Sequence, residues 1–160
     1  MRASGRRLVI ALACLCSFAV GQQSDQAIAE RILGPQWSQM SRRAGMIFIG
    51  TVLKTAIRTS TTDRRVPAAT PAVELSFRVD EAIAGTKRGQ IVTIHEWAGA
   101  RSMQRPMRSG QHILIFLYPL SRLGFTSPIG GSLGQVALDA NGKDVAPLER
   151  AIRSARSEEE

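Results

Sequence analysis

Hydrophobic and polar residues alternate most cleanly over residues 72–85, in the stretch AVELSFRVDEAIAG. Four apolar residues, Val73, Leu75, Phe77 and Val79, are separated from one another by single polar or charged residues. Such alternation is typical of a strand with one buried and one exposed face, because successive side chains point to opposite sides of a sheet. The pattern therefore predicts a half-buried strand over 72–85.

Two other stretches, 46–54 (MIFIGTVLK) and 111–120 (QHILIFLYPL), are apolar almost without interruption. A short unbroken apolar run indicates a strand that is buried on both faces. Gly50 lies inside the first run, and an isolated glycine in a strand indicates a bulge or a tight bend. Pro119 closes the second run. We therefore expect a strand over 46–54 that is bent at Gly50, and a fully buried strand over 111–120.

A third kind of strand is predicted over 90–99 (QIVTIHEWAG). Val92 and Ile94 are expected to face the core, and His95 and Trp97 to lie on the opposite face. Further short strands, broken by Gly and Pro, are expected after residue 124, with a hairpin turn at Asn141-Gly142.

Helical patterns occur at the two ends of the chain. Residues 24–45 predict two short helical segments, which Gly34-Pro35 separates. The last segment has apolar residues on one helical face, namely Leu148, Ala151, Ile152 and Ala155. Its other face is expected to point three arginines into water, namely Arg150, Arg153 and Arg156.

These elements together predict a mainly β fold. Five or six short strands with a bend-forming glycine favour a small, closed or partly open barrel of the oligonucleotide/oligosaccharide-binding type, with short flanking N- and C-terminal helices. The expected organisation is a signal peptide at 1–21, a helical segment at 22–43, the β-barrel domain at 44–145, and a C-terminal helix with an acidic tail at 146–160. The longest loops are expected at 55–72 and 99–110.

The first 21 residues have the features of a secretory signal: a basic start, an apolar run from Leu8 to Val20, and small residues before Gln22. Cleavage after Gly21 would remove three arginines and lower the net charge from +8 to +5. It would also discard Cys14 and Cys16, the only cysteines, and leave a secreted or periplasmic chain without disulfides. Two alternatives stay open: a lipoprotein anchored at Cys14, and a mature Cys-x-Cys start.

The strand segments also resemble a known family. The runs MIFIGTV, VELSFRVDEAIAGTKRGQIVTIHE and SGQHILIFLYPL are similar to secreted bacterial netrin-like domains related to tissue inhibitors of metalloproteinases. The matching positions are Phe48, Gly50, Val52, Phe77, Arg78, Val79, Gly85, Gly110, Leu114 and Phe116. The resemblance implies a barrel over about residues 44–140. The inhibitors act through an N-terminal Cys-x-Cys that chelates the target's zinc, and the mature chain expected here would lack it.

The motifs associated with catalysis or metal binding are incomplete. GGSLG (130–134) places Ser132 as the nucleophile of a Gly-x-Ser-x-Gly elbow, but no histidine follows it in the sequence. His95 and His112 are the only histidines and do not form a zinc motif. DANGKD (139–144) lacks the sixth-position glycine of a calcium loop. We therefore expect no enzyme activity, no metal and no cofactor.

Arginine is concentrated in the two long loops. The candidate binding residues are Arg58, Arg64, Arg65, Arg101, Arg105 and Arg108, with His95 and Trp97 as a possible stacking surface. Arginine forks suit phosphate or sulfate groups, and aromatic rings suit bases or sugars. Solvated loop charge explains the same pattern without any ligand.

The sequence thus favours a secreted, non-enzymatic binding module whose partner is an unknown protein or extracellular surface component. A binder of polyanions, either glycan or nucleic acid, is the alternative. A small serine hydrolase at Ser132 is the least favoured hypothesis.

Overall fold

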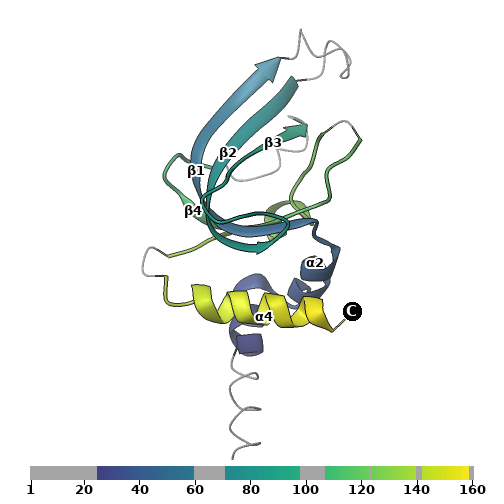
Figure 1. Ribbon diagram of the computed structural model, residues 1–160, viewed down its shortest axis with the longest axis vertical. Coiled ribbons are helices and arrows are strands. Elements are labelled where there is room, and N and C mark those ends of the chain that lie inside the picture. The colour runs from purple at the N-terminus through teal and green to yellow at the C-terminus, as the bar shows by residue number, and fades with distance from the viewer. Residues whose placement is uncertain (1–24, 60–70, 98–106, 123, 140–141, 159–160) are drawn as a thin grey trace, which may run out of the picture.

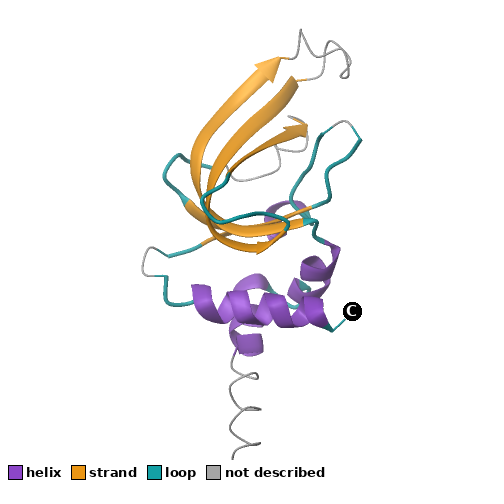
Figure 2. Cartoon of the chain, viewed as in Figure 1, coloured by secondary structure: helices purple, strands orange, loops and turns teal. Residues whose placement is uncertain are grey.

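The computed structural model describes residues 25–59, 71–97, 107–122, 124–139 and 142–158. Five strands form one antiparallel sheet in the order β3-β2-β1-β4-β5, and three α-helices lie against it (Figures 1 and 2). The strands are β1 Met46–Thr59, β2 Pro71–Ala84, β3 Ile91–Trp97, β4 His112–Leu117 and β5 Gln135–Ala137. The helices are one over residues 25–33, α2 Trp37–Arg43 and α4 Val145–Ser157, and the 3₁₀ helix η1 Gly131–Gly134 precedes β5. The expected mainly β fold is confirmed.

The sheet curves strongly along β1 and β2 (Figure 1). The β1–β2 register shifts between Ile49 and Gly50 and again between Val52 and Lys54. At Gly50 the strands approach so closely that an added Cβ would lie 2.6 Å from the carbonyl oxygen of Arg78. The bulge or bend predicted from this glycine is therefore confirmed, and it divides β1 into two halves with different surroundings.

Each face of the lower part of the sheet is covered by a separate apolar cluster. One cluster joins Ile47, Ile49, Leu114 and Phe116 to the helices. The other fills the concave side of the sheet, where Phe48, Val52, Val73, Leu75, Phe77, Val79, Val92, Ile94, Ile113, Ile115 and Leu117 are buried. Because β1 and β4 contribute to both clusters, their sequences are continuously apolar, whereas β2 alternates. The strand predicted at 46–54 is confirmed as part of β1, although Leu53 and Lys54 are exposed. The buried strand predicted at 111–120 is confirmed over His112–Leu117, whereas residues 119–120 lie beyond β4 and are exposed.

The helices from both ends of the sequence pack together beneath the sheet (Figure 1). The apolar face predicted for α4 is buried, but two of its arginines do not simply point into water. Arg153 donates hydrogen bonds to the carbonyl oxygens of Ala82 and Ile83, and Arg156 donates to those of Ser41 and Ala44. Arg153 is exposed as expected but is also bound to β2, whereas Arg156 is half-buried, so the expectation was wrong for Arg156. The carbonyl groups that both residues reach lie far away in the sequence.

The sheet is not closed, since β3 and β5 are its edges. A hydrogen bond crosses the gap, since the backbone N–H of Thr126 donates to the carbonyl oxygen of His95 at 3.2 Å. The segment around Thr126 follows β4, and Pro128 forms an isolated bridge with Leu117. A closed barrel is therefore not observed, while a curved five-stranded sheet is.

Some predicted boundaries were wrong. The loop expected at 55–72 is strand at its described ends, because β1 extends to Thr59 and β2 starts at Pro71. Arg58 consequently lies on a strand instead of in a loop. The turn expected at Asn141-Gly142 was predicted to join two strands, but in the described residues β5 is followed by α4. Asn141 itself lies outside the described residues.

Candidate functional site

The upper halves of β1, β2 and β3 present a face that no described helix covers (Figure 2). Residues paired across antiparallel strands share a face, so the register defines this surface. Its rows are Lys54–Ser76–Thr93, Ala56–Glu74–His95 and Arg58–Ala72–Trp97. We call these nine positions the open face. The alternate positions, such as Val73 and Leu75, are buried in the concave cluster on the other side of the sheet.

The register brings together three of the candidate binding residues. Arg58 and Trp97 lie in one row, on either side of Ala72, and His95 lies in the next row. Arg58 lies 37 positions before His95 and 39 before Trp97 in the sequence, and the β1–β2–β3 meander aligns it with them. The side chains of Arg58, Ala72 and Trp97 lie outside the described part, so the placement of these three residues rests on the backbone register.

His95 is less accessible than the sequence suggested. Its ring packs edge-on against Phe125, with the ring centroids 6.2 Å apart, and its side chain is half-buried. Phe125 belongs to the segment whose neighbour, Thr126, hydrogen-bonds the His95 carbonyl oxygen. His95 therefore contributes to holding this segment against the edge of β3, and only part of its ring faces solvent.

Arg108 lies at the side of the open face, in the turn that leads into β4. The N–H of Gly110 donates to the carbonyl oxygen of Val52, and the hydroxyl of Ser109 donates to that of Leu53. Exposed Arg108 directly precedes this anchored segment, which meets β1 at Val52 and Leu53, just before exposed Lys54. At about 3.3 Å per residue, Arg58 lies on the order of 15 Å further along β1. The remaining candidates, Arg64, Arg65, Arg101 and Arg105, lie outside the described residues.

A polar cluster that sequence reasoning missed lies immediately below the open face. Its centre is the carboxylate of Asp80 on β2, which accepts hydrogen bonds from the Thr51 hydroxyl at 2.7 Å and from Nε of Arg78 at 3.0 Å. Nε2 of His112 lies 3.1 Å from Oδ2 of Asp80, but the two atoms are not aligned for a hydrogen bond. Thr51 pairs with both Arg78 and His112 in the sheet, so the cluster links β1, β2 and β4.

The environment of Asp80 favours its charged form. Partial burial alone would raise the pKa of this carboxyl group, but the hydrogen bonds from Thr51 and Arg78 and the nearby positive charge outweigh it and lower the pKa. The sequence did contain a signal, because Thr51, Asp80 and His112 are polar residues within the predicted strands. Only the strand order shows that these three positions meet.

The structure places Ser132 in η1, a 3₁₀ helix between β4 and β5, where the residue is exposed. A nucleophile elbow instead requires a turn from a strand into an α-helix. Among the described residues, no group of three or more histidine, cysteine, aspartate or glutamate side chains could hold a metal ion. Within the same ranges, no helix combines the length and the apolar character needed to cross a membrane.

The chain was compared with models of protein families, with curated proteins and with solved structures, and none of them matches it. The candidate sites must therefore be interpreted from their own geometry.

Proposed function

We propose that the protein is a non-enzymatic binding module built on a partly open barrel of the oligonucleotide/oligosaccharide-binding type. Three observations support the barrel: the strong curvature of β1 and β2, the apolar filling of the concave side, and the hydrogen bond from Thr126 to His95 across the gap between the edges. The resemblance to netrin-like domains related to metalloproteinase inhibitors agrees with this architecture. Inhibition through a Cys-x-Cys start is not part of the proposal, because removal of the signal would discard both cysteines.

The proposal includes export, with cleavage after Gly21. Its support is the basic and then apolar start of the sequence. The intact mass of the protein recovered from outside the cytoplasm tests it, and a chain beginning at Gln22 is the expected result. A diacylglyceryl group on Cys14 would instead show a lipoprotein. An unmodified start at Cys14 would contradict the proposal and favour zinc-directed inhibition.

One observation carries the assignment of the binding surface: a three-stranded face lies open while the lower part of the same sheet is covered on both sides. A photo-cross-linking residue at exposed Thr93 should therefore trap a partner protein from the exported fraction. The matched control carries the same residue at Arg88, an exposed position in the turn between β2 and β3. No adduct at Thr93, or the same adducts at both positions, would refute the assignment.

Polyanion binding is a second candidate, and the register favours it specifically. Lys54 and Arg58 lie two rows apart on the open face, and Trp97 shares the row of Arg58. Arg108 precedes Ser109, whose hydroxyl donates to the carbonyl oxygen of Leu53, the neighbour of Lys54. An anionic chain could follow β1 between these cations. Retention on heparin or on single-stranded DNA should weaken with salt, and replacing Lys54, Arg58 and Arg108 by Ala should lower the salt slope by about one for each lost contact. Equal retention of this variant and of Arg88→Ala would eliminate this candidate.

We propose no reaction for the chain, and the hydrolase hypothesis remains the least favoured. Its support is limited to the spacing around Ser132. An esterase activity that disappears in Ser132→Ala, with the fold unchanged by circular dichroism, would overturn the non-enzymatic assignment.

A further inference from the structure

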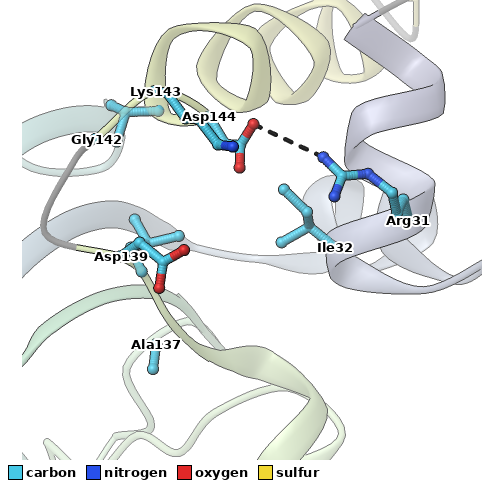
Figure 3. A pocket seen from close by; sticks show the side chains of 9 residues that line it. Arg31, Ile32, Ala137, Asp139, Gly142, Lys143 and Asp144 are labelled. Atoms are coloured by element: carbon cyan, nitrogen blue, oxygen red, sulfur yellow. Dashed lines mark ion pairs between the residues drawn. The ribbon is translucent and has the colours of Figure 1, made fainter.

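A pocket of about 180 Å³ lies away from the open face, between the first helix, the end of β5 and the start of α4 (Figure 3). Arg31 and Ile32 of the helix over residues 25–33 form one wall. The segments on either side of residues 140–141 form the rest, with Ala137, Leu138, Asp139, Gly142, Lys143, Asp144 and Val145. The pocket therefore joins parts of the chain that are more than 100 residues apart.

The charged groups around this pocket are balanced and poorly paired. Arg31 and Lys143 are cationic, and Asp139 and Asp144 are anionic. Nη2 of Arg31 lies 3.7 Å from Oδ1 of Asp144, which is longer than a hydrogen bond (Figure 3). The side chains of Asp139 and Lys143 form no hydrogen bond or ion pair in the described structure, and Asp144, although it precedes α4, does not cap it.

Other ion pairs of the same protein have shorter nitrogen–oxygen distances than the Arg31–Asp144 pair. Arg150 donates two hydrogen bonds to Asp25, at 2.8 and 3.0 Å, and Arg153 donates two to Glu149, at 2.8 and 3.0 Å. The Arg150–Asp25 pair connects the same two elements as the Arg31–Asp144 pair, namely the first helix and the α4 region. The donors of Arg31 and the acceptors of Asp144 thus remain available in the pocket.

The balance of charge limits the ligands that fit. A simple anion would meet the carboxylates of Asp139 and Asp144, and a simple cation would meet Arg31 and Lys143. A molecule that carries both charges would satisfy both sets, with its apolar part against Ile32 and Leu138. A space of about 180 Å³ suits a molecule of a few heavy atoms.

We propose that this pocket binds a small zwitterion of the free α-amino acid class. Arg31 receives the carboxylate, because a guanidinium fork matches a carboxylate with two parallel hydrogen bonds. Asp144 accepts from the ammonium group, and the apolar wall limits the side chain to a small one. This binding site is independent of the open face and of the function proposed for it.

Titrations of the ¹⁵N-labelled full chain test the proposal, with glycine, L-alanine and L-valine as zwitterionic probes and propionate and isopropylamine as singly charged ones. The amino acids should cause saturable shifts of the amide signals of residues 31–32, 137–139 and 142–145. The singly charged probes should bind at least about tenfold more weakly, since each lacks one charge-assisted contact. No saturable shift with any amino acid, or propionate binding as well as L-alanine, would overturn the proposal.

Variants connect the binding to the named residues. Arg31→Gln and the nearly isosteric Asp144→Asn should each weaken L-alanine binding at least about tenfold. Arg150→Gln is the matched control, because it loosens the same two elements without touching the pocket, and it should bind L-alanine as the unchanged protein does. If Arg31→Gln does not fold, Asp144→Asn decides the matter. Unchanged binding by Asp144→Asn, or equal loss in Arg150→Gln, would refute the assignment.

Discussion

Replacing Arg156 by methionine should destabilise the protein more than the position of this arginine near the end of the last helix suggests. Nη1 of Arg156 donates to the carbonyl oxygen of Ser41 at 2.5 Å and to that of Ala44 at 3.0 Å. Both carbonyl groups belong to the end of α2, where the last carbonyl groups of a helix lack partners within the helix. Methionine keeps much of the apolar stem but cannot donate a hydrogen bond.

The magnitude follows from the two lost contacts. A hydrogen bond from a charged group contributes about 1.5–3 kcal/mol, and these carbonyl groups are partly buried, so that water replaces only part of the loss. We expect a decrease of about 2–3 kcal/mol in the free energy of unfolding. For a chain of 160 residues, this corresponds to a decrease in Tm of roughly 5–10 °C.

Urea unfolding monitored by circular dichroism measures the effect, with Arg150→Met as the matched control on the same helix. Arg150 is exposed and pairs only with side chains, so its loss should be clearly smaller. Lysine at position 156 should restore part of the stability, because its ammonium group can reach one carbonyl oxygen. Equal, small losses in Arg156→Met and Arg150→Met would refute the view that Arg156 joins α4 to α2.

Two further predictions concern the sheet. Asp80→Asn should destabilise the protein at pH 7. In the unchanged protein, the stability that Asp80 contributes should be lost as the pH falls below about 4, because a lowered folded-state pKa favours folding only above the unfolded pKa. Chemical unfolding across pH tests this, and the same acid-dependent loss of stability in Asp80→Asn would contradict it. Leu114→Ala should lower the free energy of unfolding by about 2–5 kcal/mol, since Leu114 is fully buried. Leu133→Ala, at a position 57% exposed, should change it by no more than about 0.5 kcal/mol. Similar losses of stability in both variants would argue against the two-sided burial of β4.

The strands could be predicted from local patterns because burial alone determines those patterns. The alternation over Val73–Val79 identified β2, the apolar run around Phe48 identified β1, and the unbroken run around Phe116 identified β4 as a strand buried on both faces. Gly50 indicated the bulge, since only a residue without a side chain tolerates so close a neighbour. These signals lie within a few residues of the structure that they predict.

The remaining features depend on contacts that local patterns do not contain. Arg156 looked like a solvent-facing residue because its partners at Ser41 and Ala44 lie more than 110 positions earlier. The cluster around Asp80 needed the strand order that brings β4 beside β1. The sheet edges were also unpredictable, because whether β3 pairs with a further strand depends on the path of the chain after β4.

The pairing of the first and last described helices also affects when this chain can fold. The lower apolar face of the sheet, around Ile47, Leu114 and Phe116, is completely covered only after residues 145–157 have been synthesised. Until then, a nascent chain exposes that face and offers it to chaperones or to other chains. Folding is therefore completed after most of the chain has been synthesised. Because α4 is made last, its contacts complete the core.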